Sequence, residues 1–436
     1  MLYCNSLFSL NMDINTLYEL FLQYPSVETD TRKLKKGDIF FALKGPNFNG
    51  NHYLEQALNA GASYCVADEL SGTQNERILQ VNNSLETLQQ LAKKHREQFT
   101  IPFIAITGSN GKTTTKELVN EVLSTQFKTY TTIGNLNNHI GVPLTLLRIK
   151  NDAEMAVIEM GANHLKEIES YCIYAQPTHG IITNCGKAHL EGFGGEEAVK
   201  KGKGELFDWL KKHDGTAFIN RDYDYLVQMS NGINHVIAYG EKDGDYTGSV
   251  INDNTYLEVG ISKGAELPSI KTQLVGGYNL PNILTAVAVG KFFGVTDAKI
   301  KYALENCIPT ISRSQLVQKN GNKIILDAYN ANPSSMQLAI ENFAHMDGDK
   351  KILILGGMME LGDGSVKEHA AIVGMIKNYQ WHKVVLVGKD YGNLPPEFIH
   401  LDSSAEAKAW YQSQKFENAQ VLVKGSRSME MEKVIE

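Results

Sequence analysis

The sequence contains Ile101-Pro102-Phe103-Ile104-Ala105-Ile106-Thr107-Gly108-Ser109-Asn110-Gly111-Lys112-Thr113-Thr114-Thr115, an apolar run that ends in glycines, a lysine and three threonines. The apolar run predicts a buried strand. Apolar residues then recur at helical spacing between Leu118 and Leu123, which predicts a helix directly after the threonines. A strand that leads through a glycine-rich loop into a helix is typical of a phosphate-binding turn.

The residue types in this loop suit a nucleotide. Gly108 and Gly111 allow backbone N–H groups to turn around an anion, and the helix N-terminus adds its positive dipole. Lys112 is expected to reach the β- and γ-phosphates, and the Thr113 hydroxyl is expected to bind Mg²⁺. The strict P-loop pattern requires glycine at position 106, where this chain has Ile106. The alternative interpretation is a tight turn with a solvated lysine.

Composition narrows the class of protein. The 436 residues carry 42 Lys plus Arg and 49 Asp plus Glu, a formal charge of -7 without long blocks of one sign, so nucleic acid is not an expected partner. The five cysteines are scattered without C-x-x-C spacing, which favours neither disulfides nor zinc. Apolar runs stay shorter than the ~18 residues of a membrane span. We expect a cytoplasmic protein of two or three domains, with residues 1–11 as an extension outside the fold.

The first 98 residues predict a small α/β domain. Residues 39–43 and 64–67 are short apolar runs between polar turns, as expected of strands. Thr31, Arg32 and the turn Lys44-Gly45 could bind an anionic ligand at the surface of this domain. An ordinary salt bridge is an equally good interpretation of Arg32.

Polar residues end the predicted strands of the central region. Strand 155–158 ends at Glu159, which we expect to face the same crevice as the phosphate loop, because ligands bind at the carboxyl ends of parallel strands. The asparagine-rich stretch 134–143 predicts a loop that positions substrate or phosphates, although turn chemistry alone would explain it. His189 and the helix that contains Lys203 follow the strand at 180–184. Their alternative interpretation is a loop histidine and a solvated helix face.

The last third predicts a second α/β unit with a parallel sheet, because apolar strands alternate with helical patterns. Its predicted strands are residues 324–327, 352–355, 384–387 and 421–423. No G-x-G-x-x-G opens this unit, so a dinucleotide is not its expected ligand. Residues 215–275 hold short β-like runs with little visible chemistry, and a boundary is predicted within 307–311.

These landmarks together resemble the Mur ligase family, the ATP-dependent amide-forming enzymes of peptidoglycan precursor synthesis, from about Thr29 to the C-terminus. The stretch Asp327-Ala328-Tyr329-Asn330-Ala331-Asn332-Pro333-Ser334-Ser335 resembles the signature of the member that adds D-alanyl-D-alanine to the UDP-N-acetylmuramoyl tripeptide. Further matching motifs are Thr107-Gly108-Ser109-Asn110-Gly111-Lys112-Thr113, the run from Gly134 to Pro143, Glu159-Met160-Gly161-Ala162-Asn163 and Lys424-Gly425-Ser426-Arg427. Tyr278, Asn51 and Met358 depart from the family pattern.

The resemblance implies three α/β domains. Residues 1–98 would form a small N-terminal domain that binds the UDP precursor, and residues 99–308 a central P-loop ATPase domain with a parallel sheet. Residues 309–436 would form a Rossmann-like domain that brings the incoming dipeptide. We expect a monomer that acts in cell wall biogenesis, and thereby in cell shape and division, without nucleic acid or membrane partners.

Residue roles are implied in the same way. The expected catalytic residues are Lys112, Asn138, His189 and Lys203, where Lys203 resembles a lysine that many members carry as a carbamate. The expected ATP contacts are Gly108, Ser109, Asn110, Gly111, Lys112, Thr113, Thr114, Asn282, Arg313 and Asp327. The expected Mg²⁺ ligands are Thr113, Glu159, His189 and Lys203. The expected substrate contacts are Thr31, Arg32, Lys44, Gly45, Asn135, Asn137, Asn330, Asn332 and Ser335.

The implied reaction transfers the ATP γ-phosphoryl group to the peptide carboxylate, and the dipeptide amine then attacks the acyl phosphate. The third peptide residue, lysine or diaminopimelate, stays open. Two alternatives also stay open: a related ligase with a different amine substrate, and a nucleotide-dependent switch that hydrolyses ATP without forming an amide.

Overall fold

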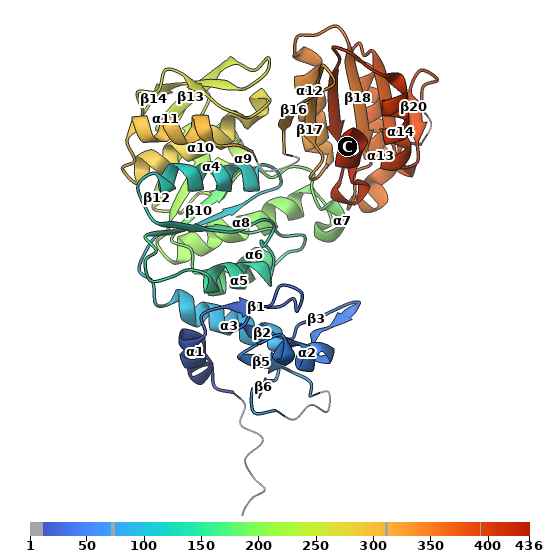
Figure 1. Ribbon diagram of the computed structural model, residues 1–436. Helices are drawn as coiled ribbons and strands as arrows, with labels where there is room; N and C mark the ends of the chain where they lie inside the picture. Colours follow the sequence, from blue (N-terminus) through green and yellow to red (C-terminus); the bar gives the residue numbers. More distant parts are fainter. Residues whose placement is uncertain (1–11, 71–74, 310–312, 393) are drawn as a thin grey trace, which may run out of the picture. The chain divides into compact units, whose positions relative to one another are not determined.

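The computed structural model describes residues 12–70, 75–309, 313–392 and 394–436, and combines helices with largely parallel sheets (Figure 1). The expected extension at residues 1–11 and part of the predicted boundary at 307–311 lie outside the described residues. The chain divides into two compact units. Unit 1 comprises Met1–Ala105, Lys128–Gly161 and Glu167–Thr178, and unit 2 comprises Ile106–Phe127, Ala162–Lys166 and His179–Glu436.

The N-terminal part of unit 1 is a four-stranded parallel sheet in the order β1-β2-β5-β6. Its strand β2 is buried at every residue, as the apolar sequence predicts, and Phe40 packs with Leu54 and Ala57 of α2. The elements are α1 (Ile14–Gln23), β1 (Val27–Glu28), β2 (Ile39–Phe41), β3 (Lys44–Gly45), β4 (Phe48–Asn49), η1 (Gly50–Tyr53), α2 (Leu54–Asn59), β5 (Tyr64–Ala67), β6 (Ile78–Gln80) and α3 (Ser84–Arg96).

Arg96, at the end of α3, is a buried cation that fixes neighbouring backbone within unit 1. Its guanidinium donates to the carbonyl oxygens of Ala175, Phe99 and Gln176 at 2.9, 2.8 and 2.9 Å. It also lies 3.7 Å from the centre of the Phe103 ring. Burial lowers the pKa of Arg96 to about 10. The side chain thus satisfies carbonyl groups that would otherwise be buried without donors.

Replacing Arg96 by methionine is expected to lower the free energy of unfolding by about 2 kcal/mol, because buried carbonyl groups lose their donors. Chemical denaturation monitored by circular dichroism measures the change. Arg221→Met is the matched control, since Arg221 forms an exposed ion pair with Asp243 and should matter by less than about 0.5 kcal/mol. Equal stability losses in the two variants would contradict the role assigned to Arg96.

The largest sheet has nine strands in the order β15-β14-β13-β12-β11-β10-β7-β9-β8. Strand β7 is buried at every residue, which accounts for the apolar run before the phosphate loop. The long strands β13 and β14 are not predicted by the sequence pattern, and they form an antiparallel pair in the region 215–275. The strands are β7 (Phe103–Thr107), β8 (Thr129–Thr131), β9 (Met155–Glu159), β10 (His179–Ile182), β11 (Thr216–Asn220), β12 (His235–Gly240), β13 (Tyr246–Asn252), β14 (Glu258–Lys263) and β15 (Ile270–Lys271).

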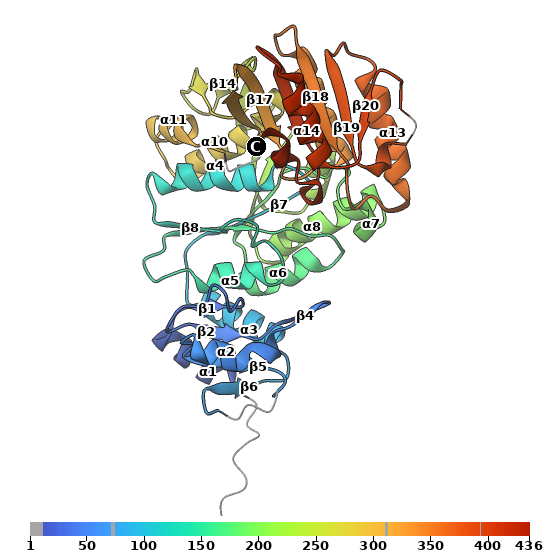
Figure 2. The ribbon, with the colours of Figure 1, turned by 45° about the vertical axis from the view of Figure 1, so that its right-hand side comes forward.

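Helices connect these strands along the chain. In unit 2, α4 and α10 pack side by side, and the short α7 lies beside α8 (Figure 2). The helices are α4 (Lys112–Ser124), α5 (Gly141–Leu147), α6 (Glu167–Ala175), α7 (Leu190–Phe193), α8 (Glu196–Lys212), α9 (Asp224–Met229), η2 (Gly277–Asn279), α10 (Leu280–Phe292) and α11 (Asp297–Asn306). No helix among the described residues has the length and apolar character that crossing a membrane requires.

The third sheet, in the C-terminal part of unit 2, has the order β16-β17-β21-β18-β19-β20 and is parallel except for β16. The four strands predicted there from the sequence are confirmed. The strands are β16 (Gln315–Lys319), β17 (Asn322–Asp327), β18 (Lys351–Gly356), β19 (Lys383–Val387), β20 (Ile399–Leu401) and β21 (Gln420–Lys424).

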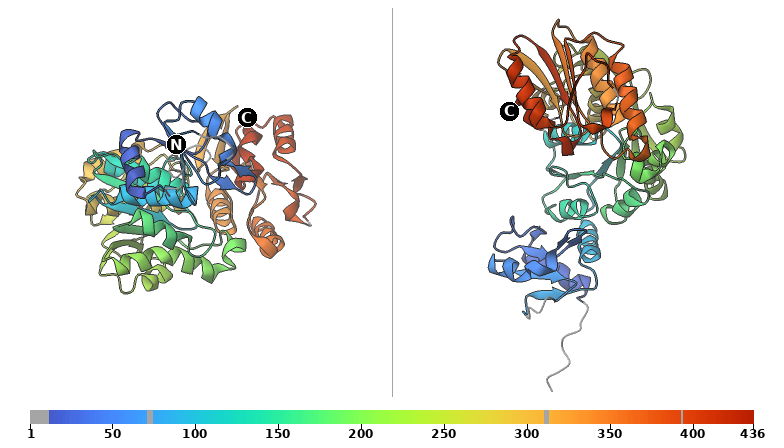
Figure 3. Two further views of the ribbon diagram at one scale, coloured as in Figure 1. Left: turned by 90° about the horizontal axis from the view of Figure 1, so that it is seen from below. Right: turned by 90° about the vertical axis from the view of Figure 1, so that its right-hand side faces the viewer.

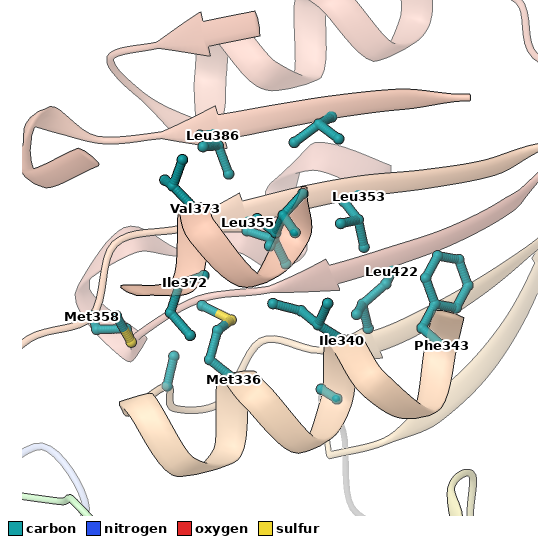
Figure 4. Close-up of a cluster of buried hydrophobic side chains, with 14 of the residues drawn as sticks. Met336, Ile340, Phe343, Leu353, Leu355, Met358, Ile372, Val373, Leu386 and Leu422 are labelled. Carbon is teal, nitrogen blue, oxygen red and sulfur yellow. The ribbon is translucent and has the colours of Figure 1, made fainter. Parts of the chain in front are cut away.

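Helices α12 and α13 cover one face of this sheet, and α14 covers the other (Figure 3). Figure 4 shows the core beneath α12 and α13, where Phe343 and Ile372 pack with strand residues such as Leu353. The last strand, β21, is inserted between β17 and β18, so three carboxyl ends meet. The helical elements are α12 (Pro333–His345), η3 (Gly362–Gly364), α13 (Ser365–Ile376), η4 (Lys389–Tyr391), α14 (Ser404–Gln414), η5 (Arg427–Met429) and η6 (Met431–Ile435).

Candidate active site

The loop between β7 and α4 needs glycine at two positions. Gly108 has φ 142° and Gly111 has φ 78°, values that residues with a Cβ rarely adopt. A Cβ at Gly108 would lie 2.0 Å from Thr183 Oγ1, and one at Gly111 would lie 2.6 Å from Asn282 Oδ1. Glycine is therefore needed at both positions, for the backbone conformation and for the close approach of Thr183 and Asn282.

The polar end of β10 braces this loop. Asn110 N–H donates to Asn184 Oδ1 at 3.0 Å, and Ser109 N–H donates to Asn184 O at 2.8 Å. In return, Thr183 Oγ1 and Asn184 Nδ2 donate to Asn110 O at 2.6 and 3.1 Å. These contacts explain why the apolar strand at 180–182 is followed by a threonine and an asparagine.

Lys112 and Thr113 occupy the first turn of α4, which begins directly after Gly111. Lys112 Nζ donates to Gly108 O at 2.8 Å and to Ser109 O at 3.2 Å, so the ammonium group lies over the loop. Thr113 is buried, with 5% of its surface exposed. The helix start thus presents a cation, a hydroxyl and the positive end of its dipole at one place.

Asn282, an expected nucleotide contact, supports the loop from α10. Its Oδ1 accepts from Thr115 Oγ1 at 3.0 Å, and its Nδ2 donates to Asn279 Oδ1 at 2.8 Å. The side chain therefore holds α4 and η2 together behind the phosphate loop. Any contact with the nucleotide stays a prediction.

Gly111→Ala is expected to weaken nucleotide binding roughly tenfold, because a left-handed residue with a Cβ costs about 1–2 kcal/mol and this Cβ would displace Asn282. Isothermal titration with ADP measures the affinity. Gly374→Ala is the matched control, since Gly374 lies in α13 with open space around its Cβ position. That control should stabilise the protein by ~0.5–1 kcal/mol and leave ADP affinity unchanged, whereas unchanged affinity in Gly111→Ala would contradict the loop assignment.

In unit 1, Glu159 ends β9 with only 1% of its surface exposed. Its Oε1 accepts from Asn137 Nδ2 at 2.8 Å, and its backbone N–H donates to Thr132 Oγ1 at 3.0 Å. Asn137 is itself fixed, because its carbonyl accepts from Gly161 N–H at 2.7 Å. The expected substrate residue Asn137 thus orients the expected metal ligand Glu159.

The neighbouring asparagines have local positions in unit 1. Asn138 Oδ1 accepts from Ile140 N–H and Gly141 N–H at 3.1 and 2.9 Å, at the start of α5, and Asn135 is exposed. Because Glu159 and Asn138 belong to unit 1 and Lys112 to unit 2, their convergence in one site stays a prediction.

Lys203 and His189 belong to unit 2. Lys203 is fully buried in α8, where its Nζ donates to Ala162 O at 2.8 Å and lies 5.0 Å from the centre of the Phe193 ring. The solvated-face interpretation of Lys203 is therefore wrong. His189, before α7, has a left-handed backbone with φ 53°, and its Nδ1 is paired with the carboxylate of Glu360.

Glu360, from the loop after β18, is not among the residues that the sequence patterns indicate. The hydrogen bond from His189 lowers the pKa of Glu360, and the Lys112 ammonium group contributes in the same direction. The carboxylate is thus held in its charged form beside two expected catalytic groups. Sequence position gave no sign of it, because His189 and Glu360 are 171 residues apart.

Asp327, at the end of β17, is paired with a second buried lysine that is not among the expected site residues. Lys424 Nζ, on the adjacent strand β21, donates to Asp327 Oδ2 at 2.5 Å and to Asn330 O at 3.2 Å. Asp327 Oδ1 accepts from Ser314 N–H at 3.2 Å. The available signal is the lysine in Lys424-Gly425-Ser426-Arg427, which directly ends an apolar strand. Arg313, an expected nucleotide contact, stacks 3.5 Å from the centre of the Tyr329 ring.

Asn332 and Ser335, expected near the dipeptide, form the capping box of α12. Asn332 Nδ2 also donates to Asn110 Oδ1 at 2.7 Å, which joins the start of α12 to the phosphate loop. Next to it, Lys187 N–H donates to Ser334 Oγ at 3.0 Å. Through Asn332, the Asp327–Ser335 signature therefore contacts the phosphate loop within unit 2.

The cations expected to bind the UDP precursor are engaged by carboxylates. Arg32 forms a salt bridge with Asp30 at 2.8 Å, which is the alternative interpretation of this residue, and it lowers the pKa of that carboxyl to about 2. Lys44 Nζ lies 3.0 Å from Asp68 and 2.8 Å from Glu69. Next to Arg32, Thr31 is half-buried, and Gly45 beside Lys44 is exposed. Their role toward a substrate stays a prediction.

A glycine-rich phosphate loop between a strand and a helix, in a chain of helices and largely parallel sheets, is typical of nucleotide-binding α/β proteins. Within that class, the chain belongs to the Mur ligase family. Family models match residues 23–96 (Mur ligase family, catalytic domain), 106–290 (Mur ligase middle domain) and 312–428 (Mur ligase, glutamate ligase domain).

Among individual relatives, the chain is 34% identical over 430 residues to UDP-N-acetylmuramoyl-tripeptide--D-alanyl-D-alanine ligase of Bacillus subtilis, covering 94% of this chain and 92% of the relative. The crystal structure of MurF from Acinetobacter baumannii superposes with a TM-score of 0.84 at 30% identity, covering 94% and 92% of the two chains. MurF of Thermotoga maritima in complex with ADP gives a TM-score of 0.85 at 27% identity, covering 95% and 96%. The predicted α/β fold of three domains is confirmed.

Proposed function

We propose that this chain is an ATP-dependent ligase that adds D-alanyl-D-alanine to UDP-N-acetylmuramoyl-tripeptide in peptidoglycan precursor synthesis. The observation that carries the proposal is the identity of about a third, over nearly the whole chain, with ligases of that name. The stretch Asp327–Ser335, which resembles the signature of that family member, supports the same substrate. We further propose that the enzyme is cytoplasmic, since ATP and nucleotide-activated precursors are cytoplasmic compounds. That it is a monomer stays a prediction.

The residues present fit a nucleotide with a divalent cation. Glycine at positions 108 and 111 lets the loop turn tightly against Thr183 and Asn282 at the N-terminus of α4, where backbone N–H groups and the helix dipole favour phosphate oxygens. Mg²⁺ is generally held by one or two protein oxygens together with substrate phosphates, and Thr113 and Glu159 offer such oxygens. Among the described residues, no group of three or more His, Cys, Asp and Glu side chains could hold a metal. The cation would neutralise phosphate charge.

The roles proposed for the side chains follow from charge. The peptide carboxylate and the triphosphate repel one another, and the Lys112 ammonium group over the loop offsets this repulsion. Asp327 and Arg313 are proposed to bind the nucleoside, and Asn330 to lie near the dipeptide. The amine of the dipeptide would attack the acyl phosphate and release phosphate. For the fully buried Lys203, we propose the carbamate form, whose negative charge would suit a neighbouring cation.

The deciding experiment measures phosphate release by the purified chain with ATP, Mg²⁺, a UDP-tripeptide and D-alanyl-D-alanine. Release should require both the precursor and the dipeptide, and mass spectrometry should find the UDP-pentapeptide. Lysine-containing and diaminopimelate-containing precursors are compared in parallel. Release without the dipeptide would support a nucleotide switch instead, and product formation only with another amine would indicate a related ligase.

A further inference from the structure

Glu360 lies on a short loop that is anchored on both sides. Met358 is buried in the core of the C-terminal sheet (Figure 4). Its N–H donates to Nε2 of the fully buried His369 at 3.0 Å. Leu361 is buried in the same core. Between these anchors the Glu360 side chain is 52% exposed. The core of the C-terminal sheet therefore holds the backbone of Glu360 in place, while its carboxylate extends out of that core and can pair with a side chain from another segment.

Two backbone features fix the partner segment against this loop. Glu191 N–H donates to Glu360 O at 3.2 Å, and Leu190 packs onto the core that contains Leu361. Glu360 and His189 both have left-handed backbones, with φ 61° and 53°, although neither is glycine. Such conformations are unfavourable for residues with a Cβ and persist only where surrounding contacts impose them. The surrounding contacts thus fix the backbones of both His189 and Glu360, and thereby the pairing of the Glu360 carboxylate with His189 Nδ1.

This pairing determines the chemistry of the histidine. An imidazole that donates Nδ1–H to a carboxylate keeps its lone pair on Nε2. Histidines that bind metals generally donate their other ring N–H to a carboxylate or carbonyl in this manner. We propose that Glu360 is a positioning residue. It fixes the tautomer and orientation of His189 so that Nε2 can ligate a divalent cation bound with the nucleotide. The inference rests on the proposed function.

A second pair offers a matched control. Lys187 Nζ lies 2.9 Å from Glu368 Oε1, so Glu368 also joins the segment before α7 to the C-terminal sheet, through α13. Glu368 pairs with Lys187, whereas Glu360 pairs with His189. A variant of Glu368 therefore tests for a simple loss of attachment, and a variant of Glu360 tests for attachment together with orientation of the histidine.

The experiment measures Mn²⁺ binding to the full chain with saturating ADP, by electron paramagnetic resonance of free Mn²⁺. Glu360→Ala should weaken Mn²⁺ binding on the order of tenfold, the usual cost of removing such a carboxylate. Glu360→Gln, which keeps an oxygen acceptor for Nδ1–H, should weaken it less. Glu368→Gln should bind Mn²⁺ as the unmodified chain does. In a His189→Ala background, Glu360→Ala should cause no further loss.

Three results would overturn the proposal: unchanged Mn²⁺ affinity in Glu360→Ala, an equal loss in Glu368→Gln, or additive losses in the double variant. Absence of Mn²⁺ binding to the unmodified chain would also overturn it. If Glu360→Ala does not fold by circular dichroism, the isosteric Glu360→Gln and its His189→Ala double variant carry the same comparison. The binding assay contains neither precursor nor dipeptide. Failure of the ligation assay would therefore overturn the proposed function alone.

Discussion

Replacing Lys112 by alanine should lower turnover on the order of 10²-fold or more, with a smaller change in the Michaelis constant for the UDP precursor. The ammonium group lies over the phosphate loop and donates hydrogen bonds to Gly108 O and Ser109 O. At this position it can stabilise the negative charge that develops on the transferred phosphoryl group. A preorganised charge of this kind stabilises the transition state more than the ground state. Initial rates of phosphate release at saturating ATP and dipeptide, with the concentration of the UDP precursor varied, measure both constants.

Lys211→Ala is the control for this experiment, because Lys211 forms a surface pair with Asp208 at 3.7 Å. Its removal should leave turnover within about twofold, as is usual for an exposed pair. Full activity in Lys112→Ala would exclude the assignment of the loop to phosphoryl transfer. An equal loss in both variants would point instead to a general effect of lost positive charge.

Replacing Lys424 by methionine should destabilise the protein by about 3–5 kcal/mol, because the partly buried Asp327 carboxylate would keep its charge without its cation. Lys424 is 2% exposed and Asp327 16% exposed, so water screens the remaining charge only slightly. The carbonyl of Asn330 would also lose a donor, which loosens the stretch expected near the dipeptide. Chemical denaturation measures the loss, and turnover should fall with it.

Two further variants separate charge from packing at this pair. Asp327→Asn combined with Lys424→Met removes both charges and should recover part of the lost stability. Lys433→Met removes an exposed lysine that pairs with Glu430, and should change stability by less than about 0.5 kcal/mol. Unaltered stability in Lys424→Met, or a double variant less stable than the single one, would contradict the buried-pair interpretation.

Local chemistry explains which parts of the site the sequence could predict. The strand, loop and helix from Phe103 to Ser124 follow from adjacent residues, since glycine conformation and helix periodicity are short-range properties. The predicted strands around Asp327 and Lys424 are confirmed for the same reason. Their pairing is not local, because it depends on β21 entering the sheet beside β17.

The missed residues share this dependence on tertiary structure. Glu360 becomes important only because its loop meets His189, and no spacing in the sequence encodes that meeting. The burial of Lys203 also cannot be predicted from the sequence of its helix, because the neighbouring lysines suggest a solvated face. Strands β13 and β14 were not predicted because glycine, aspartate and asparagine interrupt their apolar positions.

The central position of β21 affects how the chain can mature during synthesis. This strand, Gln420–Lys424, lies between β17 and β18 in the sheet but is translated after β18, β19 and β20. Until it emerges from the ribosome, β17 and β18 have unpaired edges, which are surfaces prone to aggregation. A chain truncated before this strand would therefore have a sheet with two unpaired edges and would lack Lys424, so the sheet can close only after β21 has been synthesised.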